Sequence, residues 1–259
     1  MRRVLVTGGT GRLGRVLLER ADPAEFAFRI LSRRPSPGGN RHQWATGDLT
    51  SGAGLALAVA GVDAIVHLAS NPARPADDVE AAQHLVNVAA QAGVKHLLFV
   101  SIIGADRVPY PLYQHKVAAE NVIARGPVPW SILRAAQFHT FVDELLRSAA
   151  GVPLVMPVPS GVRVQPVAES DVADRVLAAL RTGPGQRLRD FAGPEILPAR
   201  TVAREWKRAR RVHKPVIPLP FPGRVFAALR AGRNITTDAD RGAITWAAWL
   251  AGAGQVAIR

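Results

Sequence analysis

Apolar and polar residues alternate in two different rhythms along the first half of the chain. Short, almost continuously apolar runs predict strands at residues 2–8, 25–32, 61–70, 94–104 and 128–135. Between them, apolar residues recur every three or four positions, which predicts helices at residues 11–21, 77–93 and 116–126. Strands that are apolar on both sides are typical of a parallel sheet covered on both faces. The alternation therefore predicts an α/β fold with a doubly wound parallel sheet.

The pattern changes after residue 135. Prolines become frequent from Pro153 onward, and one clear helix remains at residues 170–183, with Ser170 or Asp171 as its expected N-cap. No long linker separates the two halves. We therefore expect a first domain at residues 1–135 and a small C-terminal lobe at 136–259, partly interwoven with it.

Composition excludes several classes of protein. Of the 259 residues 48% are hydrophobic, enough for a substantial core, and no apolar run reaches the roughly 18–20 residues of a membrane span. The apolar run at the N-terminus is too short for a signal peptide. The absence of cysteine excludes disulfides and thiolate chemistry, and the seven histidines show no ligand-like spacing, so we expect no metal. We expect a soluble, cytoplasmic protein.

The net charge of +13 raises the question of nucleic-acid binding. Only four of the 33 basic residues are lysines, in a chain rich in Ala, Gly, Pro and Val. This bias is typical of a GC-rich genome, and we interpret most of the charge as solvated surface. The densest basic cluster, at residues 204–214, lies on one predicted helix, where both interpretations stay open.

A glycine motif, TGGTGRLG at residues 7–14, follows the first predicted strand and opens a helix. Its first glycine allows a tight turn, the second lets the backbone approach a pyrophosphate, and the third lets helix and strand pack closely. The N–H groups and partial positive charge of the helix N-terminus favour phosphates. The motif predicts a dinucleotide site lined by Gly8, Thr10, Gly11, Arg12, Leu13 and Gly14.

The second predicted strand ends in ILSRR, where enzymes that use NAD carry an acidic residue. An acid there would bind the ribose hydroxyls and repel a 2′-phosphate. Arg33 and Arg34, with Arg12 from the glycine loop, would instead pair with that phosphate. The sequence therefore predicts NADP(H) as the cofactor; surface arginines in an arginine-rich chain are the alternative.

Residues at the ends of the next strands extend the predicted cofactor site. Asp48 in GDL (47–49) is expected to bind the adenine amino group, with Leu49 against the ring. Small residues in HLAS (67–70) leave room for a cofactor across the strand ends. The predicted lining there is Leu68, Ala69 and Ser70.

At this point the chain resembles the atypical short-chain dehydrogenase/reductase superfamily, in particular its NmrA-like and quinone-reductase-like branch. The matching stretches are VLVTGGTGRLGRVLLERA, GDL, FVSIIGADRVPYPLYQHKVAAENVI, VPWSILRAAQFHTFV, VQPVAESDVAD and GAITWAAWLA, spread over nearly the whole chain. The resemblance implies a Rossmann domain that binds NADP(H) and a C-terminal substrate lobe. It leaves activity open, because the family contains reductases of quinones, dyes and enones as well as regulators without turnover.

Standard members of this superfamily carry Tyr-x-x-x-Lys on the helix after the fifth strand. The lysine holds the nicotinamide ribose and lowers the tyrosine pKa, and the tyrosine is a general acid. Here Lys116 is in place, but Leu112 stands four residues before it and Tyr113 three. Tyr113 is thus a candidate acid about 100° out of phase on the helix, and a packing or substrate-pocket tyrosine is the alternative. For Lys116 the alternative is a solvent-exposed helix lysine. Tyr110 and His115 are further candidates.

The resemblance implies functions for two further segments. Ser101 stands at the end of the fifth strand, where the family places a serine that polarises a substrate carbonyl; an ordinary strand-end serine is the alternative. Ala135, Gln137 and Phe138 stand in the loop that passes the nicotinamide in the family. The alternative for this loop is a helix start with Phe138 and Phe141 packed in the core.

We therefore expect an NADPH-dependent oxidoreductase that transfers a hydride to an electron-poor acceptor, a quinone, an enone or a ketone. The alternatives are a non-catalytic NADP(H)-sensing regulator and a biosynthetic tailoring ketoreductase, epimerase or dehydratase. We expect a small-molecule substrate, no nucleic-acid or membrane partner, and a monomer or homodimer.

Overall fold

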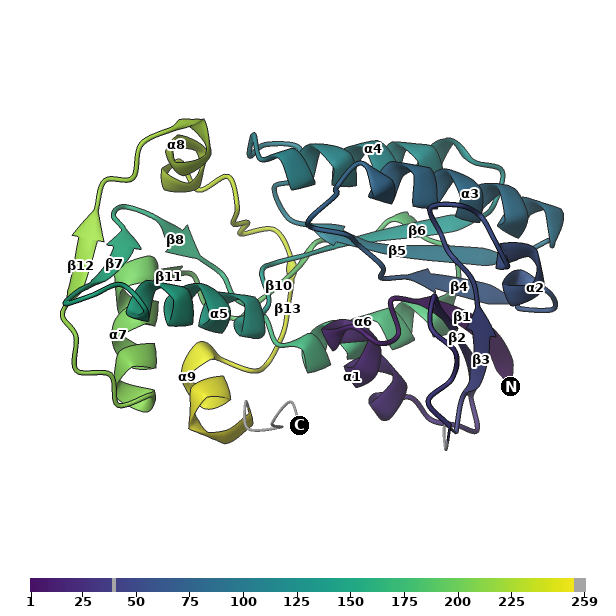
Figure 1. Ribbon diagram of the computed structural model, residues 1–259, viewed down its shortest axis with the longest axis horizontal. Coiled ribbons are helices and arrows are strands. Elements are labelled where there is room, and N and C mark those ends of the chain that lie inside the picture. Colours follow the sequence, from purple (N-terminus) through teal and green to yellow (C-terminus); the bar gives the residue numbers. More distant parts are fainter. Residues whose placement is uncertain (39–40, 254–259) are drawn as a thin grey trace. The chain divides into compact units, whose positions relative to one another are not determined.

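The chain divides into two compact units, each built from several segments. The computed structural model describes residues 1–38 and 41–253 (Figure 1). The first unit comprises residues 1–101, 111–134 and 172–188, and the second comprises 102–110, 135–171 and the chain from 189 onward.

A parallel sheet forms the centre of the first unit, with the strand order β6-β5-β4-β1-β2-β3. β1 pairs in parallel with β2 and β4, β2 with β3, and β4 with β5. The chain moves outward from β1 to β3, then returns to β4 and moves outward in the other direction. This is the predicted doubly wound Rossmann topology, which is confirmed. The strands are β1 (Arg2–Thr7), β2 (Phe26–Ser32), β3 (Gln43–Thr46), β4 (Ala64–His67), β5 (His96–Ile102) and β6 (Trp130–Ala135), with β9 (Gln186–Arg187) paired to β6.

Helices cover both faces of this sheet. Figure 1 shows α3 (Asp77–Gln91) and α4 (Pro111–Arg125) on one face, and α1 (Arg12–Arg20) and α6 (Glu169–Thr182) on the other. The short α2 (Leu55–Val59) packs against α3. Because both faces are covered, the strands are apolar on both sides, as the sequence predicts.

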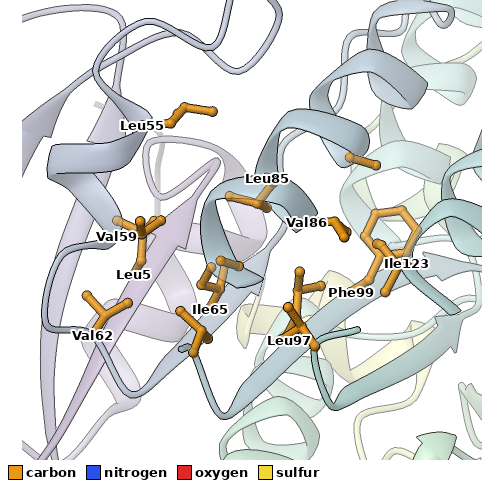
Figure 2. Close-up of a cluster of buried hydrophobic side chains, with 14 of the residues drawn as sticks. Leu5, Leu55, Val59, Val62, Ile65, Leu85, Val86, Leu97, Phe99 and Ile123 are labelled. Atoms are coloured by element: carbon orange, nitrogen blue, oxygen red, sulfur yellow. The ribbon is translucent and has the colours of Figure 1, made fainter. Parts of the chain in front are cut away.

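The main core of the first unit lies between the sheet and helices α2 to α4 (Figure 2). Leu5, Ile65 and Leu97 come from three neighbouring strands, and Leu85 and Ile123 come from α3 and α4. Each of these side chains is at most 2% exposed. Burying one side chain of this size contributes about 1.5–3 kcal/mol, so this layer holds the strand ends in a fixed register.

The second unit contains short strands and a tryptophan-rich core. Trp246 and Trp249 stack with ring centroids 5.3 Å apart, and Trp206 packs in the same cluster. β7 (Met156–Pro159) pairs with β12 (Val216–Leu219), β8 (Arg163–Val164) with β11 (Leu197–Pro198), and β10 (Phe191–Ala192) with Ala135 and with β13 (Asp240–Arg241). The helices are α5 (His139–Ala150), α7 (Ala199–Ala209), α8 (Arg224–Arg230) and α9 (Trp246–Ala248), followed by a π-helical turn (Trp249–Ala253).

Two predicted helix starts differ from the structure. α6 begins at Glu169, so Ser170 and Asp171 lie in its first turn, and the prediction that one of them is its N-cap is wrong. The Asp171 carboxylate instead accepts a hydrogen bond from the backbone N–H of Ile244 at 3.0 Å. α4 begins at Pro111, five residues before the predicted start, because proline is well suited to the first turn of a helix. Within the ranges described, no helix is both long and apolar enough to cross a membrane.

Candidate cofactor and catalytic site

The carboxyl ends of neighbouring strands meet at one edge of the sheet in the first unit. Thr7, the last residue of β1, is in register with Leu31 of β2 and with His67 of β4, and Ser32 is in register with Thr46 of β3. Ligands of open α/β sheets bind at this edge, where the strand order reverses. The predicted segments that follow these strands are 8–14, 33–34, 47–49 and 68–70.

The glycine loop is shaped by close contacts that a side chain would prevent. Gly8 has a φ of +71°, and a Cβ on it would lie 2.7 Å from the backbone N of Ala69. A Cβ on Gly14 would lie 2.3 Å from the carbonyl oxygen of Gly8. At Gly11 a Cβ would meet only that same oxygen, at 3.1 Å. Gly8 and Gly14 are thus required by the protein's own packing, whereas Gly11 leaves space outside the loop.

The first turn of α1 begins directly at this loop. Gly11 is its N-cap residue, and among the described residues no side chain caps the turn or places an acid in it. Thr10, Gly11 and Arg12 are exposed. The N–H groups and the partial positive charge of this helix end suit a pyrophosphate.

Arg33 and Arg34 follow β2 and are exposed. Their turn is held on both sides, because the backbone N–H of Arg34 donates to Ser32 Oγ at 3.0 Å and its carbonyl accepts a hydrogen bond from Trp44 Nε1 at 2.8 Å. The backbone at Arg34 is therefore fixed, and two exposed arginine side chains follow the strand end at which a ribose-binding acid would stand.

The adenine-side residues are partly engaged within the protein. The Asp48 carboxylate accepts a hydrogen bond from the backbone N–H of Thr50 at 2.9 Å. Leu49 is half-buried and packs against the core cluster of the first unit. Leu68 and Ala69 are also half-buried, whereas Ser70 is exposed. Ala69 and Ser70 have the shortest side chains of this lining.

A buried ion pair joins α3 and α4. Lys116 Nζ lies 3.1 Å from Oδ2 of Asp78, and the two side chains are only 6% and 5% exposed. The ammonium also lies 5.0 Å from the centre of the Phe99 ring, within cation–π range. Burial lowers the pKa of Lys116, and the charge of Asp78 opposes this effect. Lys116 is therefore not a solvent-exposed helix lysine.

His67 lies next to this pair, at the end of β4. Its ring stacks on Phe99 with centroids 5.1 Å apart, and its Nδ1 lies 2.7 Å from the Thr7 hydroxyl. Burial, together with the positive charge of Lys116, lowers the pKa of His67 to about 3. His67 is therefore neutral at physiological pH and adds no second positive charge.

Asp78 and His67 were not predicted from the sequence as part of the site. Asp78 stands in an acidic first helical turn, a pattern that the helix dipole alone explains. A signal was present: Asp78 precedes Ala82 by four residues and Leu85 by seven, so it shares the apolar face of its helix. An acid on a buried face needs a partner.

The predicted catalytic residues Ser101 and Tyr113 also belong to the first unit. Ser101 lies two residues beyond Phe99 in β5, so both face the same side of the sheet. Ser101 is buried, and no hydrogen-bond partner reaches its Oγ in the described part of the chain. Tyr113 is half-buried in α4, three residues before Lys116.

The loop after β6 lies in the second unit. Ala135 ends the strand and is buried, and Phe138 is the N-cap residue of α5. The carbonyl of Gln137 accepts a hydrogen bond from the backbone N–H of Val167 at 3.0 Å, so the loop has a defined path. Phe141 is 44% exposed, which contradicts the alternative that it packs in the core.

Comparison with known proteins identifies the family. The sequence profile of the NAD(P)H-binding family matches residues 8–182, and the chain belongs to this family. The resemblance to the atypical short-chain dehydrogenase/reductases is confirmed.

Three relatives illustrate the range of the family. The (4-alkanoyl-5-oxo-2,5-dihydrofuran-3-yl)methyl phosphate reductase of Streptomyces griseus is 34% identical over 210 residues, which cover 76% of this chain and 70% of that protein. The photosystem II assembly factor Ycf39 of Synechocystis is 29% identical over 148 residues, 52% of this chain and 45% of that protein. The NADPH-dependent quinone oxidoreductase of Escherichia coli has the same fold, with a TM-score of 0.76 at 16% identity over 97% of this chain and all of that one.

Proposed function

We propose that the protein is an NADPH-dependent reductase that transfers a hydride to an electron-poor acceptor, a quinone, an enone or a ketone. The observation that carries this proposal is the buried Lys116–Asp78 pair, in the same unit as the glycine loop and the exposed arginines after β2. A phosphate cradle, a 2′-phosphate site and a buried ammonium group are what a reduced nicotinamide dinucleotide needs from a protein.

The residues at the strand ends fit NADP(H). The helix end at Gly11 would bind the pyrophosphate, and Arg33 and Arg34 would pair with the 2′-phosphate through charge-assisted bonds. Asp48 retains acceptor capacity for an adenine amino group, because each carboxylate oxygen has more than one lone pair. Ser32, Arg33 and Arg34 provide no carboxylate that would repel the phosphate.

Lys116 and Ser101 are proposed to act nearest the reaction. The cofactor supplies the hydride when bound; the protein orients it and the acceptor. The Lys116 ammonium would hold the nicotinamide ribose by its hydroxyls. The Ser101 hydroxyl, on the sheet face that carries Phe99, would donate to an acceptor carbonyl and polarise it.

The position of Tyr113 favours acceptors that need little acid catalysis. A quinone gains a hydride and becomes a stabilised oxyanion, which takes its proton from water to give the hydroquinone. An enone behaves similarly, because its negative charge is delocalised onto the carbonyl oxygen. The name of the Streptomyces griseus relative describes an unsaturated lactone with an alkanoyl group, which belongs to this class of acceptor.

The test is NADPH consumption, followed by the absorbance of the reduced nicotinamide. The acceptors are a small benzoquinone, an acyl-substituted unsaturated lactone and a simple ketone, with NADH as the matched donor. We expect turnover of the quinone or the lactone with NADPH, and slower turnover of the ketone. A protein that binds NADPH and consumes it with none of them would contradict the reductase proposal.

A cofactor-sensing regulator is the second candidate. It is favoured by the missing Tyr-x-x-x-Lys tyrosine and by a relative that is named an assembly factor. In that case NADPH and NADP⁺ should bind with different affinities, without consumption of NADPH. A third candidate, a biosynthetic tailoring ketoreductase, epimerase or dehydratase, would convert one dedicated substrate and leave general quinones untouched.

A further inference from the structure

Asp78 makes three polar contacts although it is almost completely buried. Its Oδ2 lies 3.1 Å from Lys116 Nζ and accepts a hydrogen bond from Ser70 Oγ at 2.7 Å. Its Oδ1 accepts a hydrogen bond from the backbone N–H of Asn71 at 2.9 Å. One carboxylate thus connects the helix that carries Lys116 with the segment that follows β4.

We infer that Asp78 is a positioning residue for the cofactor: it keeps Lys116 charged and in place, and it fixes the strand-end segment at Ser70 and Asn71. The inference rests on the proposed role of Lys116 in holding the nicotinamide ribose. It assigns Asp78 a role through other groups, without contact to the acceptor.

The charge of Lys116 depends on Asp78 because the other nearby groups cannot replace it. His67 of β4 is neutral and stacks on the Phe99 ring. Glu120, one turn further along α4, favours the charged lysine more weakly. Its carboxylate is bound by Arg134, with N–O distances of 2.8 and 2.6 Å. Among the described residues, Asp78 is the carboxylate in contact with the ammonium.

The same contact leaves donors for a ligand. A lysine ammonium has three N–H groups, and Asp78 engages one of them. Phe99 supports the ammonium from one side without taking up a hydrogen bond. An ammonium held in this way can donate to two adjacent ribose hydroxyls without first having to be ordered, which lowers the entropic cost of binding.

The experiment compares three substitutions in the full chain. Asp78→Asn removes the charge at nearly constant volume, and Asp78→Glu keeps the charge on a longer side chain. Asp77→Asn is the matched control for charge, because Asp77 is the neighbouring acid of the same helical turn and pairs with Arg74 instead of Lys116. The amide oxygen of the new side chain can still accept the hydrogen bond that the Asn71 side chain donates to Asp77 at 3.0 Å. If Asp78→Asn does not fold, Asp78→Ser removes the same charge with a smaller side chain.

The first readout is the titration of Lys116, followed by NMR of protein labelled at the lysine ε-carbon. The chain has only four lysines, and Lys116→Arg assigns the signal. We expect Asp78→Asn to lower the pKa of Lys116 by about one pH unit or more, because one pH unit corresponds to a modest interaction between charges. Asp77→Asn and Asp78→Glu should leave this pKa nearly unchanged. A merely structural role would not separate these variants.

The second readout is the calorimetric affinity for NADPH between pH 6 and 9. We expect Asp78→Asn to weaken NADPH binding about tenfold at neutral pH, since two charge-assisted hydrogen bonds are affected. The pH above which NADPH affinity is lost should also be lower in this variant than in the wild type. Asp78→Glu should recover most of the affinity. If the folded Asp78→Asn variant and the wild-type protein bind NADPH with equal affinity, this inference is overturned and the proposed function still stands. A wild-type protein that binds no NADPH would refute the proposed function itself and, with it, this inference.

Discussion

The Thr7 hydroxyl lies 2.7 Å from Nδ1 of His67 and joins the carboxyl ends of β1 and β4. The same hydroxyl oxygen accepts a hydrogen bond from the backbone N–H of Ala69 at 3.3 Å. A hydroxyl oxygen can accept two hydrogen bonds, or accept one and donate its own proton, so either tautomer of the His67 ring is compatible with this contact. Burial strongly lowers the pKa of His67, so the imidazole in this contact is neutral.

Loss of stability in mild acid follows from three such histidines. Burial lowers the pKa of His67 to about 3, and that of His96 and His139 to about 4. Below the ordinary histidine pKa of 6.5 the unfolded chain therefore binds protons that the folded protein does not. The free energy of unfolding consequently decreases as the pH is lowered. Each histidine should contribute up to about 1.4 kcal/mol per pH unit between pH 6 and 4.5. Urea unfolding at pH 7 and pH 5 measures this loss.

A substitution separates the share of one histidine. The substitution His67→Asn keeps a hydrogen-bonding group next to Thr7 but removes the titratable one. The stability of the variant should therefore depend less steeply on pH than that of the wild type, although it is lower at pH 7. If the free energy of unfolding of the variant depends on pH as steeply as that of the wild type, His67 does not contribute to the loss of stability in acid.

The preference for NADPH should depend on Arg33. We expect NADPH to bind roughly tenfold tighter than NADH or more, because a hydrogen bond to a charged group is worth about 1.5–3 kcal/mol. Arg33→Asp should shrink or invert the ratio, since an acid repels the 2′-phosphate and accepts hydrogen bonds from ribose. Arg125→Asp, at the exposed end of α4, is the control of equal charge. Equal calorimetric affinities in the wild type would disprove the assignment.

The glycine loop allows binding and folding to be separated. Gly11→Val should abolish binding of the cofactor while the fold survives, because a Cβ there meets one protein atom and otherwise occupies the space outside the loop. Gly14→Ala should destabilise the fold itself, since its Cβ would clash with the Gly8 carbonyl. Thermal melts and NADPH titrations of both variants test this contrast. A folded Gly11→Val variant with normal affinity would exclude the loop as the phosphate cradle.

Lys116 should matter more than Tyr113 if a quinone is reduced. Loss of the ammonium misplaces the hydride donor, and a displacement of about 1 Å can cost on the order of a hundredfold in rate. Tyr113→Phe should cost less than about tenfold, whereas a working general acid is worth about 10²–10⁴. The measurement is kcat/KM of Tyr113→Phe and Lys116→Ala with one acceptor. A hundredfold loss of kcat/KM in Tyr113→Phe would instead favour a carbonyl reductase in which Tyr113 is the general acid despite its shifted position on the helix.

Local signals predicted most of the first unit. The glycine loop, its flanking strand and α1 depend on contacts between near neighbours such as Gly8 and Gly14, so the motif alone was sufficient. The partners of Lys116 and His67 could not be predicted, because they lie 38 and 60 residues away in the sequence. Their pairing is set by the packing of α3 on α4 and of β1 on β4. The start of α6 was predicted incorrectly because Asp171, a good cap by type, bonds to Ile244 instead.

The segmented construction of the first unit has a consequence for how the protein is made. α6 is fastened to the rest of this unit by the ion pairs Arg20–Asp174 and Arg181–Glu25, and its Val172 and Val176 are fully buried. β9, which follows it, pairs with β6. While the ribosome is still adding these elements, α1 is the helix that covers the face of the emerging sheet on which α6 later packs. The first unit can therefore complete its core only after residue 188 has left the exit tunnel, late in translation.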